Sequence, residues 1–254
     1  MSGGHLHALH VHGHSPVHRM APEAKVAALF VFVLGVVATP REVMWAFGIH
    51  AFLLLAVVTF AELPVGFVLR RMTIELPFIA FALFLPFLGG GPQTEVWGIG
   101  LSQEGLWGAW NIFAKATLGV GASVTLIATT EIPHLLHGLD RLRVPRLFTA
   151  IAGFMVRYIE VIAGEVQRTR TAMTARGHDP RWLWQVGPLA TAAGALFVRS
   201  YERGERVHQA MVARGYDGRM PTLDERKATA VEWLSAMAIP LTAWMTVLLV
   251  LVTP

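Results

Sequence analysis

The 254-residue sequence contains no cysteine, which excludes disulfides, zinc–thiolate sites and catalytic thiols. Charged residues are scarce as well, at 15% of the chain against about 25% in a typical soluble domain. The sequence has no G-x-x-x-x-G-K-[ST] phosphate loop and no H-E-x-x-H metal motif. It also lacks a basic segment followed directly by an apolar one, the mark of a secretory signal. These absences argue against a self-contained ATPase and an intramembrane enzyme of that metal-binding type, and the N-terminus is not expected to be a secretory signal.

Apolar residues, in contrast, make up 54% of the chain, and the mean hydropathy is +0.51. A membrane span needs about 20 predominantly apolar residues. Five segments come close to that requirement: 26–38 (extendable back to 21), 43–61, 74–88, 106–130 and 231–252. Prolines inside the third segment predict a kink. The fourth is rich in Gly, Ala, Ser and Thr, which favours close packing inside a helix bundle.

The basic residues are concentrated in one part of the chain. Residues 140–227 hold 15 of the 21 Lys and Arg, whereas residues 89–106 hold none. Because cytoplasmic loops of membrane proteins carry the excess of Lys and Arg, we expect 140–227 and the N-terminus in the cytoplasm. The block lacks the interleaved aromatic residues of an RNA-binding surface, so we expect a lipid bilayer and no nucleic acid as partner.

Two long amphipathic helices are expected in this basic region, from 145 to 177 and from about 188 to 214. We therefore predict an all-α membrane protein with about five transmembrane helices and long amphipathic cytoplasmic coupling helices. Its expected divisions are a His-rich cytoplasmic tail (1–20), an N-terminal transmembrane bundle (21–131), a coupling-helix region (132–228) and a C-terminal transmembrane helix (229–254).

A repeated segment ends each of these amphipathic helices. The sequence R-x-x-x-A-M-x-A-R-G-x-D occurs twice, 38 residues apart, first with Arg168 and Asp179 at its ends and then with Arg206 and Asp217. Gly177 and Gly215 stand where a left-handed residue ends a helix, and Arg176 and Arg214 are expected at the last helical position, favourably placed for the helix dipole. Helix capping alone requires the glycine but neither the shared Ala-Met nor the Asp. Two such ends carry small alanine side chains and planar guanidinium groups. This combination favours docking to two similar partners or to one dimer.

Two Ala-Arg-Gly segments ending long amphipathic helices, after N-terminal spans, resemble the transmembrane coupling (T) component of energy-coupling-factor (ECF) transporters, and the resemblance covers nearly the whole chain. It implies a subunit that is not an enzyme, placed in the inner cell membrane. Its implied partners are two ABC-type ATPase subunits, which bind ATP and Mg, and a substrate-binding membrane subunit; the chain itself needs no cofactor. The implied ATPase-coupling residues are Ala175, Arg176, Gly177, Ala213, Arg214 and Gly215, with Arg168, Arg206, Asp179 and Asp217 in support.

The substrate is suggested by the compact length, the paired motifs and the N-terminal tail. Imidazole suits nickel, cobalt, copper and zinc, and six histidines lie in fourteen positions: His5, His7, His10, His12, His14 and His18. The tail is a candidate metal-binding segment, and a solvated tail is the alternative. The cobalt/nickel group of the family, with cobalt favoured, fits the chain; a vitamin transporter of the same family and a membrane anchor without a transport role are the alternatives.

Three isolated histidines fit a structural role better than a metal site. His50 lies alone in the second apolar segment and is interpreted as a hydrogen-bonded packing residue. His134 and His137 share a helix face, but no third histidine is near them in the sequence.

Overall fold

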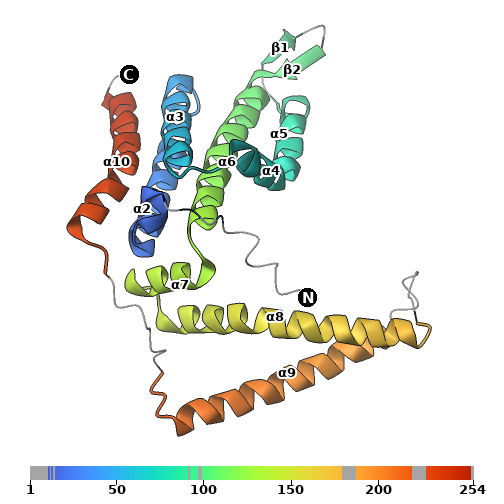
Figure 1. The fold of residues 1–254 in the computed structure, drawn as a ribbon. Coiled ribbons are helices and arrows are strands. Elements are labelled where there is room, and N and C mark those ends of the chain that lie inside the picture. Colours follow the sequence, from blue (N-terminus) through green and yellow to red (C-terminus); the bar gives the residue numbers. More distant parts are fainter. Residues whose placement is uncertain are drawn as a thin grey trace. The chain divides into compact units, whose positions relative to one another are not determined.

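A computed structural model of the chain describes residues 11, 13, 15–90, 92–96, 99–178, 187–218 and 227–252. These residues form helices almost throughout (Figure 1). The chain divides into two compact units, one made of residues 6–142 and 226–254 and the other containing residues 143–225.

The first unit is a bundle of apolar helices (Figure 1). Its helices occur in the order α1 (Pro16–Arg19), α2 (Pro22–Ala38), α3 (Met44–Phe60), α4 (Val65–Met72), the 3₁₀ turn η2 (Thr73–Glu75), α5 (Leu76–Leu88), α6 (Gln103–Thr129), α7 (Ile132–Arg141) and α10 (Ala230–Val252). Helix α2 packs against α10, α6 and α7, and α5 packs along α6. Every expected apolar segment therefore corresponds to a helix of this bundle.

The core of the bundle is built from small and aromatic side chains between α2, α3, α6 and α10. Phe32, Val36, Phe47 and Leu118 are buried there, together with alanines of α6 and α10. Small residues let helix axes approach closely, which is how apolar helices gain contact where lipid offers no hydrophobic driving force. The sequence expectation that the segment 106–130 packs inside the bundle is confirmed, because α6 contacts α2, α3, α4 and α5.

The third apolar segment differs in detail from the expectation. Helix α4, η2 and α5 follow one another without a break and form a candidate span of 24 residues, Val65–Leu88. Pro77 lies in the first turn of α5, where the missing amide hydrogen is tolerated, whereas Pro86 lies inside the helix. Between α5 and α6, which was expected to be a glycine-rich loop, strands β1 (Gln93–Val96) and β2 (Ile99–Ser102) pair antiparallel.

Among the described residues, four helical stretches are long and apolar enough to cross a membrane: Val65–Leu88, Gln103–Thr129, Arg146–Ala175 and Ala230–Val252. Helices α2 and α3, with 17 residues each, are shorter than this criterion. The sequence predicts about five spans, and two of these, α2 and α3, do not meet this criterion. Helix Arg146–Ala175 does meet it, although the sequence places this segment among the coupling helices.

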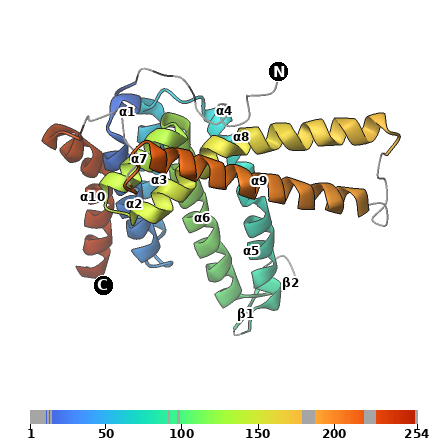
Figure 2. The ribbon, with the colours of Figure 1, turned by 90° about the horizontal axis from the view of Figure 1, so that it is seen from below.

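The second unit contains two long helices, α8 (Arg146–Ala175) and α9 (Gly187–Ala213). They run antiparallel, so the C-terminus of α8 and that of α9 lie at opposite ends of the pair (Figures 1 and 2). Both helices have charged residues inserted in an apolar pattern, as the sequence predicts, and neither contains a fully buried residue. Helix α7 belongs to the first unit, although the expected coupling-helix region begins at residue 132. The functional limits of the four expected divisions stay a prediction.

Candidate coupling site at two helix ends

The first Ala-Arg-Gly segment forms a complete helix cap. Helix α8 ends at Ala175, and Gly177 takes a left-handed conformation with φ of 77°. The His178 amide donates to the Met173 carbonyl at 3.0 Å, and the Gly177 amide donates to the Thr174 carbonyl at 2.9 Å. This pair of bonds is the Schellman arrangement, which satisfies carbonyls that the helix end would otherwise leave without a partner.

The second segment forms the same cap. Helix α9 ends at Ala213, and Gly215 has a φ of 82°. The Tyr216 amide donates to the Met211 carbonyl at 3.0 Å, and the Gly215 amide donates to Val212 at 2.9 Å. The prediction that both glycines end their helices in the left-handed region is confirmed. Each arginine lies one position beyond the last helical residue rather than within the helix.

Exposure follows the same pattern at both ends. Ala175, Arg176 and Gly177 are exposed while Met173 is half-buried, and the equivalent residues of the second segment repeat this pattern. Within the part of the chain that the structure describes, neither the Arg176 nor the Arg214 guanidinium has a hydrogen-bond or ion-pair partner. Each end therefore presents a planar guanidinium group beside a capped backbone that carries small side chains. Such a surface can bind a carboxylate or the carbonyls of another helix end.

One glutamate links the two helices near their middle. The Glu165 carboxylate accepts from Arg203 at 3.1 Å and from Arg199 at 3.2 Å. Glu165 and Arg203 are 38 residues apart, as are the two copies of the repeat, so the two residues occupy equivalent positions. Arg176 and Arg214 each lie eleven residues beyond this contact, or about 16 Å along the helix.

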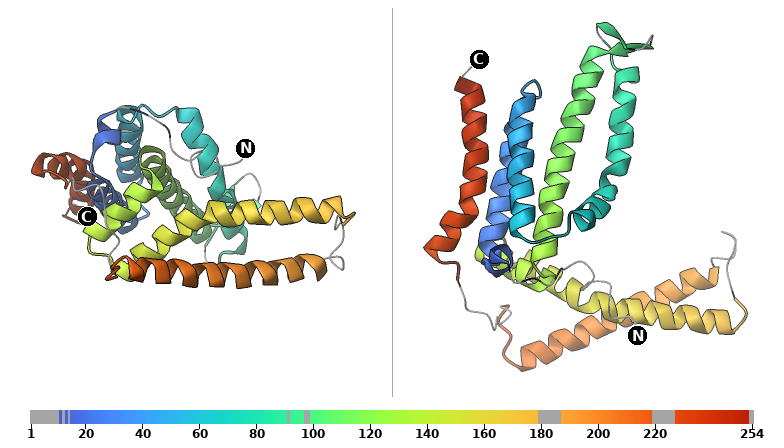
Figure 3. Two further views of the ribbon diagram at one scale, coloured as in Figure 1. Left: turned by 60° about the horizontal axis from the view of Figure 1, so that its bottom comes forward. Right: turned by 45° about the horizontal axis from the view of Figure 1, so that its top comes forward.

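The contact between equivalent positions has a geometric consequence. In an antiparallel pair, a contact between equivalent residues lies on the axis of an approximate twofold relation. The two capped ends therefore lie at similar distances from that axis and point away from each other (Figure 3). The sequence shows the repeat but not this arrangement, which depends on which helix faces contact each other.

The supporting residues differ in their surroundings. Arg206 forms an ion pair with Glu202 at 3.8 Å, one turn earlier on the same helix. Arg168 is exposed on α8, and Asp217 is exposed two residues after Gly215. Asp179 lies outside the described residues. The role of these residues in partner binding stays a prediction.

The histidine tail lies mostly outside the described residues, and this applies to His5, His7, His10, His12 and His14. Both ring nitrogens of His18 make hydrogen-bond contacts, Nδ1 with the Ser15 hydroxyl at 2.7 Å and Nε2 with the Val11 carbonyl at 3.0 Å. Among the described residues no group of three His, Asp or Glu could hold a metal ion. A metal at His18 would have to displace one of these contacts, and metal binding by the tail stays a prediction.

His50 is a packing residue, as the sequence predicts. It is fully buried, with its ring edge-on to Phe32 and Phe47. Its Nε2 lies 3.2 Å from the Thr246 hydroxyl, which joins α3 to α10. Of the other two histidines, His134 is exposed and lies 3.9 Å from Glu131, and no metal-binding group forms around either in the described chain.

Comparison with known proteins identifies a matching family and several relatives. A family model described as CbiQ, cobalt transport protein, matches residues 13–223. A cobalt transport protein CbiQ of Rhodobacter capsulatus is 30% identical over 192 residues, 75% of either chain. The ECF transporter transmembrane protein EcfT of Streptococcus thermophilus is 24% identical over 220 residues, 81% of this chain and 83% of the relative. The EcfT protein of Staphylococcus aureus is 24% identical over 247 residues, 89% and 88% of the two chains.

The match extends over both units of the chain and includes both capped ends. The resemblance based on the two Ala-Arg-Gly segments is therefore confirmed, and the apolar helices agree with a multi-pass membrane protein. The chain belongs to the CbiQ family of cobalt transport proteins, within the transmembrane components of ECF transporters.

Proposed function

We propose that this chain is the energy-coupling transmembrane subunit of an ECF-type importer for cobalt ions, with nickel as the related substrate. It links two cytoplasmic ABC-type ATPases to a substrate-binding membrane subunit. The ATPases carry the ATP and Mg, and this chain performs no catalysis. The name of the matching family supports a cobalt substrate over the vitamin alternative.

The observation that carries this proposal is the pair of equivalent helix ends. Both have the same Schellman bonds, the same exposed Ala-Arg-Gly and the same separation from the Glu165–Arg203 contact. Two ends related by an approximate twofold axis can bind two partners that are related in the same way, because each partner then contacts the same surface. A membrane anchor without a transport role would not need two matched arginines.

Each end is suited to insertion into a groove of an ATPase. The alanines at 172, 175, 210 and 213 add little bulk around the cap, so that another chain can approach the backbone. Arg176 and Arg214 then supply the directional contact, because a guanidinium binds a carboxylate through two parallel hydrogen bonds. Closure of the two ATPases on ATP moves both ends, and α8 and α9 pass that movement to the membrane partners. The excess of Lys and Arg in residues 140–227 supports a cytoplasmic side for these helix ends and, with it, a cytoplasmic N-terminus.

Co-purification tests the proposal. The chain is expressed with the proteins encoded beside it, and the ATPase retained in detergent is measured for the wild type, for Arg176→Ala, for Arg214→Ala and for the double variant. Loss of a buried charged contact at an interface typically costs about 2–5 kcal/mol. We expect weaker retention in each single variant and almost none in the double variant.

Arg170→Ala is the matched control, because Arg170 is an exposed arginine of α8 that lies outside the cap. It should retain the ATPase like the wild type. An ATPase that binds equally well without Arg176 and Arg214 would show that the repeat is only a pair of well-formed helix ends, and the proposed coupling role would be wrong.

A further inference from the structure

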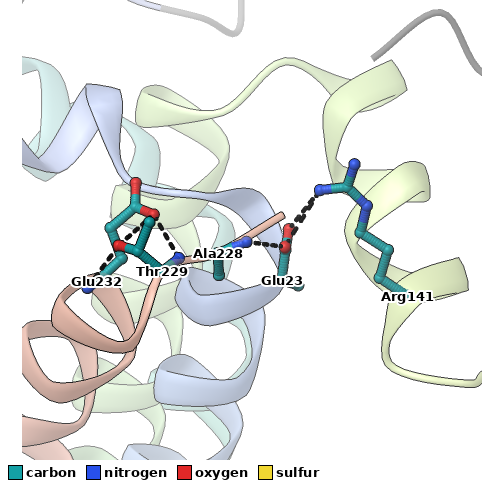
Figure 4. A network of polar contacts seen from close by, with 5 residues as sticks. All are labelled: Glu23, Arg141, Ala228, Thr229 and Glu232. Carbon is teal, nitrogen blue, oxygen red and sulfur yellow. Dashed lines mark hydrogen bonds and ion pairs between the residues drawn. The ribbon is translucent and has the colours of Figure 1, made fainter. Parts of the chain in front are cut away.

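Glu23 lies where the chain leaves the bundle for α8 and where it returns to α10. Its carboxylate is buried, with the residue 4% exposed. It accepts from the Arg141 guanidinium at 3.1 Å, at the end of α7, and from the Ala228 amide at 2.8 Å, just before α10 (Figure 4). One side chain of α2 therefore contacts the last turn of α7, which precedes the α8–α9 unit in the chain, and the residue before the start of α10, which follows that unit.

The backbone of α7 is held close to the start of α2. Gly138 is buried, and a Cβ atom there would lie only 2.9 Å from the Glu23 nitrogen and from the Pro22 carbonyl carbon. Only a glycine permits this approach. Arg141 follows one turn later on the same helix face, which brings its guanidinium to the Glu23 carboxylate.

The start of α10 is equally well defined. Thr229 and Glu232 form a capping box, in which the Glu232 amide donates to the Thr229 hydroxyl at 3.3 Å and the Thr229 amide donates to the Glu232 carboxylate at 2.8 Å (Figure 4). Ala228, whose amide donates to the Glu23 carboxylate, immediately precedes this capping box. A displacement of Ala228 is therefore a displacement of the first turn of α10.

We propose that Glu23 is a positioning residue for energy coupling. Its carboxylate holds the end of α7 and the residue before the α10 capping box on the first turn of α2, so that a movement of the α8–α9 unit carried along the chain reaches α2 and α10 together. The inference rests on the proposed function, because it requires a movement of α8 and α9 driven by the ATPases. It adds the site in this chain at which that movement enters the bundle.

The position of the contact distinguishes it from other buried polar contacts of the bundle. Lys25, two residues later on α2, is also buried and donates to the His18 and Thr129 carbonyls and to the Thr130 hydroxyl. Those acceptors tie the N-terminal segment to the end of α6, and none of them belongs to α7, α8 or α10. Lys25 therefore supplies a matched control, as a buried charged residue of the same helix that holds the bundle but not the connections.

The test compares transport with ATP hydrolysis in the complete transporter. The complex is reconstituted into liposomes, and uptake of radioactive Co²⁺ and release of phosphate are measured for Glu23→Ala, Glu23→Gln, Arg141→Lys and Lys25→Met. We expect Glu23→Ala to keep the ATPases bound while uptake per ATP hydrolysed falls about tenfold, within the range of usual coupling free energies. Glu23→Gln keeps an acceptor for the Ala228 amide, so its uptake per ATP hydrolysed should fall less. Arg141→Lys keeps the positive charge, so its uptake per ATP hydrolysed should stay near that of the wild type.

Lys25→Met should lower the yield and melting temperature of the complex but leave the uptake per ATP unchanged. The inference would be overturned if Glu23→Ala transported as much Co²⁺ per ATP as the wild type. It would also be overturned if both Glu23 variants and Lys25→Met merely lowered the yield, since Glu23 would then serve folding alone. Failure of the proposed function gives a different result, because the wild-type chain would then retain no ATPase, or would retain it independently of Arg176 and Arg214.

Discussion

The bundle and the α8–α9 pair are both helical, but they are held together in different ways. The bundle has residues with no exposed surface, such as Ala24, His50 and Ala243, on three different helices. The pair has no fully buried residue, and large apolar side chains such as Phe148 and Phe197 are more than 60% exposed within it. Buried packing therefore stabilises the bundle, whereas the pair has little buried surface to stabilise it and is expected to open locally at a lower free-energy cost.

The largest expected difference between the two regions concerns aromatic side chains. Phe47→Ala removes a ring that packs between His50 and Trp110, and such a truncation costs about 3–5 kcal/mol. Phe197→Ala removes a ring that is 73% exposed, and should change stability by less than about 0.5 kcal/mol in the isolated chain. Thermal unfolding in detergent measures both. Similar effects of the two substitutions would contradict the comparison.

The next largest effect on stability is expected from a methyl group added where α7 contacts α2. Gly138→Ala places a Cβ against the backbone of Pro22 and Glu23, and overpacking of this kind costs about 1–3 kcal/mol. Gly204→Ala in α9 is the control, because no atom lies within 4 Å of the added group. We expect a lower melting temperature for Gly138→Ala only, and an unchanged melting temperature would mean that α7 does not pack this closely.

The glycine of the first cap should affect partner binding more than stability. Gly177→Ala forces an alanine into the left-handed region, which costs about 1–2 kcal/mol and weakens the local cap. Gly153→Ala, inside the same helix with open space around it, should be neutral or slightly stabilising. Retention of the ATPase is the measurement. Equal retention by the two variants would show that the partner does not recognise the cap.

The smallest effect is expected at the contact between α8 and α9. Glu165→Ala removes two ion pairs of partly exposed arginines, each of which contributes about 0–1 kcal/mol, and less at high salt. Because the chain has no cysteine, spin labels on Thr171→Cys and Gln209→Cys report one distance between the helices. Glu165→Ala should broaden that distance distribution, whereas Glu202→Ala, which removes a pair within α9, should leave it unchanged.

Much of this architecture follows from local sequence patterns. Apolar runs locate the helices of the bundle, and the repeated Ala-Arg-Gly locates the ends of α8 and α9 together with the left-handed glycines. These features depend on neighbours within a few residues, which is the range over which periodicity and capping act. The pairing of β1 with β2 was missed, since the segment between α5 and α6 reads as a loop rich in glycine.

The contacts that organise the candidate sites could not be predicted in this way. Glu23 contacts residues 118 and 205 positions away, and Glu165 contacts Arg199 and Arg203 on another helix. A charged residue at the start of an apolar helix was a visible signal for Glu23, but its partners are set by the packing of α2 against α7 and α10. Long-range pairing of this kind depends on the fold rather than on local propensity.

The contact of Glu165 with Arg203 has a further consequence for how such a pair of helices can arise. If one helix paired with a second copy of itself, the residue on the twofold axis would meet its own kind, and two like charges would repel. Joining two copies of a helix in one polypeptide removes that constraint, because the two equivalent positions can then mutate independently. An acid and a base can occupy the axis while both outer ends keep the shared Ala-Met-x-Ala-Arg-Gly-x-Asp pattern. Two copies of a helix in one chain thus permit an attractive centre between two similar ends, which a symmetric homodimer of single helices could not have.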